Sequence, residues 1–385
     1  MMNPLEFIVF GSPQITEEDI NAVVTTMKSG WIGTGPKSHE FEKIVADYKQ
    51  ANFSVALNSC TAALHLALNN LNLSEDDEVI TTTMTFCATV NAILHAGAKP
   101  VLVDCDPITF NIDPLKIEAA ITPNTKAILP VHFAGYPCDM DAIMSIAKKY
   151  NLAVVEDCAH AIETQFNGKP VGTFGSMGCL SFYVTKNICT GEGGMVITND
   201  SEIANRIRIQ ALHGMSKDAW KRFGDDGYKH YQVVEKGFKY NLTDMAAAMG
   251  IEQMKRITQN HNRRKDIFNR YTDAFQHLPL QLPADCPPQH IHGYHLYNPQ
   301  LLLDPATLSR DALLGKLNDR KIGCGVHYRA VHLHPYYSSI LDISPNQFPH
   351  ANAISDRTFS IPISAKLSDD EVNYIIDTLQ ELLSI

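Results

Sequence analysis

Between about residues 52 and 200 the chain alternates short runs of β-branched and apolar residues with segments of helical periodicity. The predicted elements are strands at 78–82, 99–103, 126–131 and 152–155, and helices at 88–95 and 139–150. Such alternation is typical of βαβ units, in which a mostly parallel sheet carries helices on its faces. The pattern predicts an α/β fold, whose ligands bind beyond the carboxyl ends of the strands.

The pattern changes in the second half of the chain. One long helix is predicted over 241–275, capped by Thr243, and a Pro-rich break follows at 283–288. New strand and helix signals come after the break, so we expect a large domain over 1–250 and a smaller α+β domain over 251–385. The stretch 218–236 is charged, aromatic and weakly periodic, which predicts a long exposed loop of a kind that is often functional.

Composition narrows the classes of partner. The 42 acidic and 32 basic residues give a net charge of −10, which disfavours nucleic acid as a partner but leaves room for a locally basic pocket. The first residues lack the basic region of a signal peptide, and no apolar run approaches the roughly 18 residues of a membrane span. The nine cysteines are scattered without a CxxC pair, which predicts reduced thiols, no metal site and a cytoplasmic protein.

Two junctions carry candidate ligand-binding residues. In the stretch 59–68 a polar turn opens into a strongly helical run, whose free amides and Thr61 hydroxyl suit a phosphate. An ordinary helix N-cap explains the same pattern. Asp157 follows the predicted strand 152–155, where a carboxylate can pair with a pyridinium nitrogen and keep it protonated. The alternative for Asp157 is a structural carboxylate that caps the following turn.

Lys186 lies in a turn between two apolar, β-rich runs at 180–184 and 195–198. A single lysine is usually a solvated surface charge, but this one is surrounded by Ser, Thr, Tyr and small residues. A desolvated lysine amine is the group that forms imines with carbonyl cofactors. The glycines at 191, 193 and 194 allow a close backbone approach beside it.

The phosphate turn, Phe86, Asp157 and Lys186 follow one another as in fold-type I pyridoxal-phosphate (PLP) enzymes, the class of aspartate aminotransferase. The chain resembles the DegT/StrS family of nucleotide-sugar aminotransferases nearly from end to end. The motifs that carry the resemblance are SGWIGTGP (29–36), NSCTAALHLAL (58–68), VEDCAHA (155–161), SFYVTKNICTGEGG (181–194), HGMSKDAW (213–220), GFKYNLTDMAAA (237–248) and GVHYRAVH (325–332).

The resemblance implies a role for each matched residue. Lys186 would carry PLP as a Schiff base and later shuttle protons, while Asp157 would pair with the pyridine nitrogen. Phe86 would stack on the ring, and His160 would lie near its other side or its hydroxyl. These roles make Lys186, Asp157 and His160 the expected catalytic residues. The residues expected at the cofactor phosphate are Thr61, Ala62 and Ser181.

In this family a segment of the neighbouring subunit completes the site, which implies a homodimer with shared active sites. The matching segment here is 237–241, and it departs from the commonest pattern, G-x-N-Y-R. Lys239 stands where the phosphate-binding Asn is usual, and Asn241 lies two positions on, so both are candidates for that contact. The same arrangement of Lys and Asn occurs in the branch of the family that resembles the enzymes of UDP-4-amino-4-deoxy-L-arabinose synthesis.

Three residues are candidates for substrate binding. His327 and Tyr328 resemble a substrate-facing turn of the small domain, although a structural histidine at a strand-to-loop corner is an alternative for His327. Trp31 would line the cleft for the sugar nucleotide, with plain packing as its alternative.

The resemblance also implies a reaction, in which glutamate donates its amino group, becoming 2-oxoglutarate, and a keto-sugar nucleotide accepts it. The motif K-N-x-x-T-G-E-G-G at 186–194 resembles that of enzymes acting on carbon 4, which favours a 4-keto nucleotide sugar as the substrate. A UDP-linked sugar is the favoured form. Its product would serve the synthesis of cell-surface polysaccharide or lipid A. Three alternatives stay open. They are a carbon 3 aminotransferase, a PLP-dependent dehydratase, in which His typically replaces the lysine, and a non-catalytic relative, which would tend to lose Lys186 or Asp157.

Overall fold

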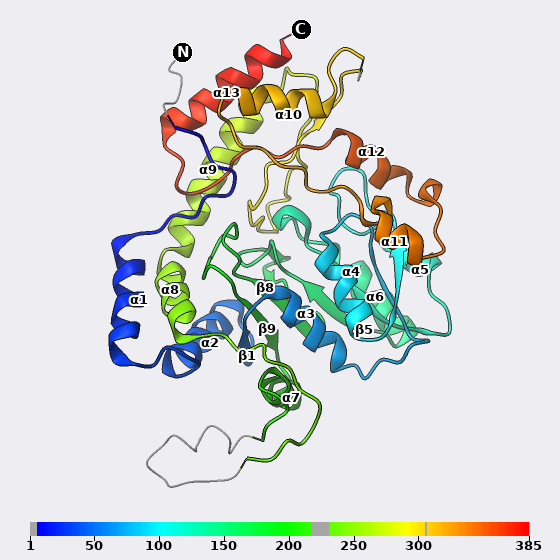
Figure 1. Cartoon of the computed structure of the whole chain (residues 1–385). Helices are drawn as coiled ribbons and strands as arrows, with labels where there is room; N and C mark the ends of the chain where they lie inside the picture. The colour runs from blue at the N-terminus through cyan, green and yellow to red at the C-terminus, as the bar shows by residue number, and fades with distance from the viewer. Residues whose placement is uncertain (1–5, 217–230, 305, 385) are drawn as a thin grey trace.

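The computed structural model describes residues 6–216, 231–304 and 306–384, so most of the loop predicted at 218–236 lies outside the described residues. Figure 1 shows a central sheet between helices, with a second group of helices above it near both chain ends. The strands are β1 Phe53–Leu57, β2 Glu78–Thr82, β3 Lys99–Val103, β4 Thr125–Leu129, β5 Ala153–Asp157, β6 Gln165–Phe166, β7 Lys169–Pro170, β8 Met177–Ser181, β9 Gly194–Thr198, β10 Leu280–Gln281 and β11 Gln300–Leu301. The α-helices are α1 Glu17–Ser29, α2 Pro36–Lys49, α3 Cys60–Asn69, α4 Cys87–His95, α5 Pro114–Ala119, α6 Met140–Tyr150, α7 Ser201–Ala211, α8 Asp244–Lys255, α9 Ile257–Phe275, α10 Arg310–Asp319, α11 Pro335–Ile340, α12 Pro349–Arg357 and α13 Asp369–Leu383.

Seven strands form the central sheet in the order β1-β9-β8-β5-β4-β2-β3. The pairs from β8 through β5, β4 and β2 to β3 are parallel, whereas β9 is antiparallel to both β8 and β1. The mostly parallel α/β sheet predicted from the sequence is therefore confirmed. Some strand boundaries differ: β4 ends at Leu129, two residues before the predicted end, and β5 continues through Glu156 to Asp157, which pairs with Cys179 of β8.

The strands send alternate residues to opposite faces of the sheet, as the two-residue period of a strand requires. Ile128 and Val154 face an apolar cluster that includes side chains of α2, α6 and α8. Their neighbours Leu129 and Val155 face a second cluster, to which α3, α4 and α7 contribute. Helices cover both faces, and therefore the strands are apolar along most of their length.

The long helix predicted over 241–275 is wrong, because the structure contains two helices, α8 and α9, which meet at Arg256. Arg256 has φ −106° and ψ 5°, outside the helical region, and its guanidinium lies 2.7 Å from the buried carboxylate of Asp19 in α1. α8 packs against α1 and α2, whereas α9 packs against α13. These different packing partners explain the break, which the periodicity of the segment does not reveal. Thr243 caps α8, as predicted, by accepting a hydrogen bond from the amide of Ala246.

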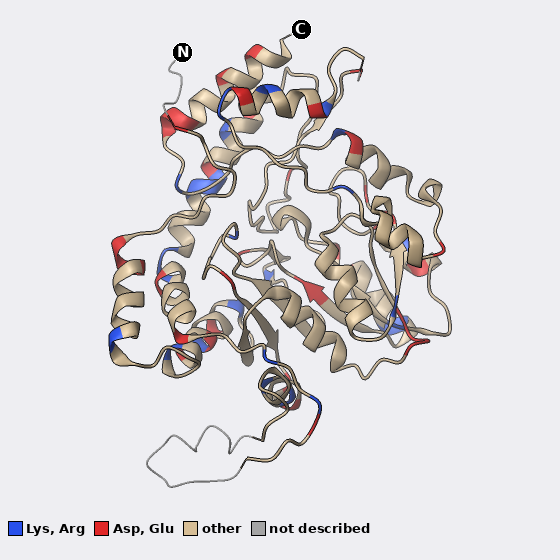
Figure 2. Ribbon diagram, viewed as in Figure 1, with Lys and Arg blue, Asp and Glu red and all other residues tan. Residues whose placement is uncertain are grey.

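The C-terminal helices enclose a separate apolar cluster built from α9, α10, α13 and the residues between them. Ile8, from the start of the chain, belongs to this cluster and forms a bridge with Ile322. The expected domain boundary at 250/251 lies within α8 and stays a prediction. Lys and Arg positions are scattered among Asp and Glu positions in the view of Figure 2. No helix in the described part of the chain is long and apolar enough to cross a membrane.

The carboxylate of Asp244, at the first turn of α8, holds the start of α2. It is fully buried and accepts hydrogen bonds from the amides of Gly35 (2.7 Å), Lys37 (3.0 Å) and Ser38 (2.9 Å), and from the Ser38 hydroxyl (2.7 Å). The α2 N-cap, Gly35, has no side chain, so Asp244 satisfies amides that would otherwise have no partner. This contact ties the loop before α2 to the segment that leads into α8.

We expect Asp244→Ala to lower the free energy of unfolding by about 3 kcal/mol, because it removes a charged acceptor and leaves buried amides unpaired. The matched control is Asp200→Ala, which removes the exposed N-cap of α7 and is expected to cost about 1 kcal/mol. Urea unfolding at one fixed protein concentration measures both. Equal losses for the two variants would contradict the role given to Asp244.

Candidate active site

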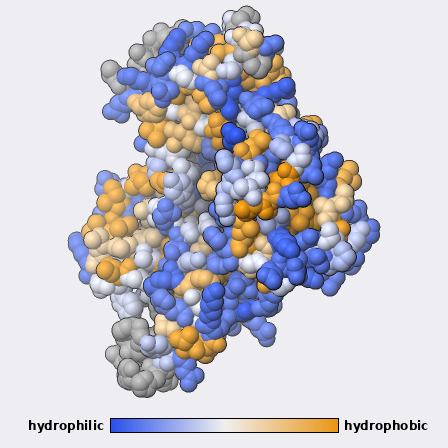
Figure 3. Space-filling view, turned by 45° about the vertical axis from the view of Figure 1, so that its right-hand side comes forward, coloured by the Kyte–Doolittle hydropathy of each residue, from blue (hydrophilic) through white to orange (hydrophobic). Residues whose placement is uncertain are grey.

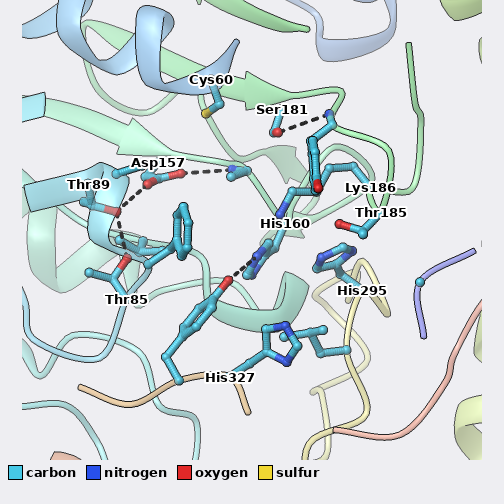
Figure 4. A pocket seen from close by; sticks show the side chains of 18 of the residues that line it. Cys60, Thr85, Thr89, Asp157, His160, Ser181, Thr185, Lys186, His295 and His327 are labelled. Atoms are coloured by element: carbon cyan, nitrogen blue, oxygen red, sulfur yellow. Dashed lines mark hydrogen bonds between the residues drawn. The ribbon is translucent and has the colours of Figure 1, made fainter. Parts of the chain in front are cut away.

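The parallel pairing of β5 with β8 brings their carboxyl ends to one edge of the sheet, where a cavity of about 590 Å³ opens. Residues from distant parts of the sequence line it, from the starts of α3 and α4, the end of β5 and the loop between β8 and β9. The chain segments 10–11 and 325–328 close its other side. Figure 4 shows the polar side chains of these segments around the cavity.

Lys186 lies in the loop that joins β8 to β9, which the structure forms as the predicted strand–turn–strand unit. Its backbone amide donates to the carbonyl of Tyr183 at 2.8 Å. Its amine lines the cavity and has no hydrogen-bond partner among the described residues. Burial lowers the pKa of Lys186 to about 8, although Cys60 and Asp157 act to raise it. Roughly a tenth of this amine is therefore neutral and nucleophilic at pH 7, far more than for an ordinary lysine.

Asp157 presents a buried carboxylate, only 4% exposed, at the last position of β5. Its Oδ2 accepts a hydrogen bond from the Thr89 hydroxyl at 2.9 Å, and its Oδ1 accepts one from the amide of Ala159 at 3.1 Å. The Thr85 hydroxyl lies 2.7 Å from that of Thr89 and donates to it, since Thr89 uses its own proton on Asp157. Burial raises the pKa of Asp157, while the bonds from Ala159 and Thr89 and the charge of Lys186 lower it.

No side chain among the described residues forms an ion pair with Asp157. A buried carboxylate without a cation is costly, and a protonated pyridine nitrogen is a cation of the size that a cavity at this edge could accept. The donor set therefore fits PLP, with Asp157 for the ring nitrogen and Lys186 for the aldehyde carbon.

His160 is buried, and both of its ring nitrogens are engaged. Nδ1 accepts a hydrogen bond from the amide of Ala134 at 3.2 Å, so the proton of the neutral ring is on Nε2. Nε2 lies 3.1 Å from the hydroxyl of Tyr328 and donates to it, which leaves the Tyr328 proton available to the cavity. Burial lowers the pKa of His160 well below its usual value, so the ring stays neutral. The exposed ring of Phe86 lies 5.9 Å from that of Tyr328, across the mouth of the cavity.

The start of α3 lies beside the cavity, as expected for a phosphate site. Thr61 and Ser181 line the cavity, but Ala62 does not, and its amide donates to the N-cap hydroxyl of Ser59 at 3.1 Å. The amides of Cys60 and Thr61 are in the first helical turn, where no intrahelical partner exists. A Cβ at Gly194 would lie 2.3 Å from the backbone of Ser59, so only glycine lets β9 approach this turn.

Three expected site residues lie away from the cavity of their own chain. Trp31 is 54% exposed in the loop between α1 and α2, and Lys239 is exposed in the segment before α8. Asn241 donates to the hydroxyl of Thr34 at 2.6 Å, which joins its segment to the Trp31 loop. Figure 3 shows hydrophobic surface on the side of the molecule where α1 lies. Thr34 thus connects the loop of Trp31 with the segment that contains Lys239 and Asn241.

His327 and Tyr328 both line the cavity from the C-terminal part of the chain. His327 stacks on Phe10 with ring centroids 5.2 Å apart, and its Nδ1 lies 2.9 Å from the Ser360 hydroxyl. Burial lowers the pKa of His327 to about 4. The cavity brings together eight of the residues singled out by sequence, namely Thr61, Phe86, Asp157, His160, Ser181, Lys186, His327 and Tyr328.

Sequence reasoning missed other polar groups at the cavity. Thr85 and Thr89 flank Phe86 with the i, i+4 spacing of one helical turn, and this spacing at the start of a predicted helix was a usable signal. His295 lies in an irregular segment with no local pattern that marks it.

A buried group of His132, Glu156 and Cys158 has the proximity of metal ligands. Its acceptors are already used, because Glu156 accepts from three amides and from His132, and His132 accepts from the amide of Cys138. The arrangement is that of a hydrogen-bonded core, which holds the end of β5 in place.

Known proteins resemble this chain over nearly its whole length. The model of the DegT/DnrJ/EryC1/StrS aminotransferase family matches residues 13–380. The spore coat polysaccharide biosynthesis protein SpsC of Bacillus subtilis is 43% identical over 378 residues, which are 98% of this chain and 97% of SpsC. The PMP form of Spr1654 from Streptococcus pneumoniae has a TM-score of 0.91 at 34% identity, covering 98% of this chain and 99% of that chain. PseC of Helicobacter pylori, an aminotransferase involved in the biosynthesis of pseudoaminic acid, has a TM-score of 0.91 at 26% identity, covering 98% and 100% of the two chains.

Spr1654 is also known in a PLP form, which has a TM-score of 0.90 against this chain. The fold-type I architecture, the sugar aminotransferase class and the cofactor pyridoxal 5′-phosphate, all predicted from the sequence, are confirmed by these matches. Because the family model matches residues 13–380 and SpsC is 43% identical over nearly the whole chain, the chain belongs to the DegT/DnrJ/EryC1/StrS aminotransferase family.

Proposed function

We propose that this enzyme transfers the amino group of glutamate to carbon 4 of a UDP-linked 4-keto sugar. The observation that carries the aminotransferase chemistry is the presence, at one cavity, of the Lys186 amine and the buried Asp157 carboxylate, neither of which forms an ion pair with another residue in the described ranges. PLP, when bound, supplies an electron sink that stabilises negative charge on the carbon that loses a proton. The protein contributes binding, orientation and proton transfer.

Each residue of the cavity has a definite part in this proposal. Asp157, held by Thr89 and Ala159, keeps the ring nitrogen protonated. Lys186 binds the cofactor and carries the proton that moves during transfer, since its pKa of about 8 lets the amine both accept and release a proton near neutral pH. The Tyr328 hydroxyl, whose oxygen accepts from His160, offers its proton to an oxygen in the cavity. Phe86 covers the ring at the mouth of the cavity.

The charge of the substrates calls for cations that one chain does not supply. A nucleotide sugar carries a diphosphate and glutamate carries two carboxylates, yet Lys186 is the single Lys or Arg among the described residues that line the cavity. We infer that a partner subunit supplies further charge through Lys239, with Asn241 beside it, and that Trp31 enters the same shared site. The active form is then a homodimer, and we propose that it acts in the cytoplasm, where nucleotide sugars are made.

The choice of sugar rests on the sequence motif and on the relatives. The K-N-x-x-T-G-E-G-G motif and the Lys239–Asn241 arrangement favour the branch that resembles UDP-4-amino-4-deoxy-L-arabinose synthesis. The names of SpsC and PseC point to sugars of spore coat polysaccharide and to pseudoaminic acid in those proteins. We therefore place UDP-4-keto-pentose first, then UDP- and dTDP-linked 4-keto-6-deoxyhexoses, as precursors of cell-surface polysaccharide or lipopolysaccharide.

A panel of keto-sugar nucleotides tests this directly. With glutamate labelled at nitrogen, we expect mass spectrometry to find label in the product of a UDP-4-keto sugar and 2-oxoglutarate in equal amount. Lys186→Ala is the matched control and should incorporate none. Label in a 3-keto sugar alone would establish the carbon 3 alternative, loss of a sugar hydroxyl without label would establish a dehydratase, and label in no sugar would reject the proposal.

The pKa of Lys186 predicts how cofactor attachment depends on pH. Only the neutral amine attacks the aldehyde, so the rate at which stripped enzyme takes up PLP should rise with pH and level off above about 8. An ordinary lysine would require a pH near 10.4. Borohydride trapping followed by peptide mapping measures the rate and the site together. Label on another lysine, or a rate that still climbs beyond pH 10, would contradict the assignment of Lys186.

Subunit complementation tests the shared site. Lys186→Ala chains lack the cofactor amine, and chains with Lys239→Ala and Asn241→Ala lack the segment expected to act on the partner. Each parent homodimer should have at most a few per cent of wild-type activity. The first parent lacks the amine that binds the cofactor, and the second lacks charge-assisted contacts, which are strong. Mixed dimers restore one complete site and should regain roughly a quarter to half of the activity, since half of their sites at most are intact. Verified mixed dimers without recovery would reject the shared site.

A further inference from the structure

His295 is a polar group at the cavity whose role does not follow from the proposed reaction. It is 7% exposed and lies in the segment before β11, far along the chain from Lys186. Its ring is 4.3 Å from that of His160, with an interplanar angle of 31°. Figure 4 shows the His295 ring next to Thr185, on the side of the cavity where Lys186 enters.

Asn187, the residue after Lys186, determines which nitrogen of His295 carries the proton. The Asn187 amide nitrogen donates to Glu163 Oε2 at 2.8 Å and to the carbonyl of Gly293 at 2.8 Å. Both of these groups only accept hydrogen bonds, so the amide orientation is determined and Asn187 Oδ1 is left as an acceptor. His295 Nδ1 lies 3.0 Å from that oxygen and must donate to it.

The network behind this contact is buried and charged, which keeps it in one arrangement. Glu163 forms an ion pair with the buried guanidinium of Arg264 in α9, so it stays an acceptor for Asn187. Burial lowers the pKa of His295 well below its usual value, and the charge of Lys186 lowers it further. His295 is therefore a neutral ring with its proton on Nδ1 and a lone pair on Nε2.

The Nε2 atom of His295 has no hydrogen-bond partner within the described ranges, and neither has the amine of Lys186. The two other histidines at the cavity are bound differently. His160 uses both nitrogens, on Ala134 and Tyr328, and His327 stacks on Phe10 and contacts Ser360. Of these three rings, His295 alone is tied by its own hydrogen bond to the residue next to Lys186.

We propose that His295 is a positioning residue for Lys186, whose Nε2 accepts a hydrogen bond from the Lys186 amine once that amine is released from the cofactor during amino transfer. The proposal rests on Lys186 carrying PLP. The amine leaves the cofactor once in each transfer, and a long, unbranched side chain loses its orientation at that moment unless an acceptor holds it. No proton passes to His295; the amine keeps its protons and shares one.

The hydrogen bond has a measurable consequence, because an acceptor favours the ammonium form of lysine. The other ionisable groups around the amine come from several elements. Those that line the cavity are Cys60 of α3, Asp157 of β5, His160, Tyr183, Glu192, His327 and Tyr328. Removing the acceptor on His295 alone, with these groups unchanged, should lower the pKa of Lys186.

Two amide substitutions separate the functions of the two nitrogens. In His295→Asn the amide NH₂ takes the place of Nδ1–H, which keeps the Asn187 contact and removes the acceptor at Nε2. In His295→Gln the longer side chain places an amide oxygen near the position of Nε2. The full-length enzyme in its pyridoxamine phosphate form leaves the Lys186 amine free, and competitive acetylation with peptide mass spectrometry gives the pKa of that lysine.

We expect the pKa of Lys186 to fall by about one unit in His295→Asn and to stay near the wild-type value in His295→Gln. The single-turnover rate with 2-oxoglutarate should fall roughly tenfold in His295→Asn, with little change in the concentration of 2-oxoglutarate at half-maximal rate. If His295→Asn does not fold, His295→Ala replaces it, and added imidazole should restore the Lys186 pKa.

An unchanged Lys186 pKa in His295→Asn, or no restoration by imidazole in His295→Ala, overturns the proposal even if activity falls. An unchanged pKa together with a raised KM for the keto sugar would assign His295 to sugar binding instead. In the PLP form, acetylation of Lys186 should be blocked. Failure of that block would refute the cofactor attachment itself, which is a separate result from the effect of His295.

Discussion

Asp157 is a buried carboxylate that forms no ion pair within the described part of the chain, and the rest of the site is arranged around this group. The cost of burying such a charge is offset in part by the amide of Ala159 and the hydroxyl of Thr89, whose own geometry depends on Thr85. In the binding mode that we propose, the ring nitrogen of the cofactor would supply the remaining compensation, and binding of PLP would then also stabilise the folded site. The parallel pairing of β5 with β8 places this carboxylate at the edge of the sheet where the Lys186 loop begins.

Burial also determines the charge of the groups around Lys186. Three imidazoles surround the cavity, and burial lowers the pKa of each, so that His160, His295 and His327 remain neutral. A neutral imidazole has one donor and one acceptor, and the contacts of His160 and His295 determine which is which. The cavity therefore presents donors and acceptors in defined places without adding positive charge that would raise the cost of protonating Lys186.

The Trp31 loop and the segment of Lys239 and Asn241 lie away from the cavity of their own chain. Asp244 holds the start of α2, and Asn241 bonds to Thr34 in the loop before it. These contacts make the Trp31 loop and the segment of Lys239 one connected unit, which exposes an indole and an ammonium group together. It is this connected unit to which our proposal assigns a role in the site of a partner subunit.

The sequence by itself determined the α/β alternation, the strand–turn–strand unit of Lys186 and the position of Asp157 at a strand end. These features depend on residues close together in the chain, where periodicity and turn chemistry act directly. Only the tertiary structure decided the break at Arg256, because it depends on a carboxylate in α1 more than 200 residues away in sequence. It also decided that His295 meets Asn187, and that Trp31 lies outside the cavity of its own chain. Burial, ion pairing and hydrogen bonding between distant segments leave no periodic mark on the chain, and therefore they appear only when the fold brings those segments together.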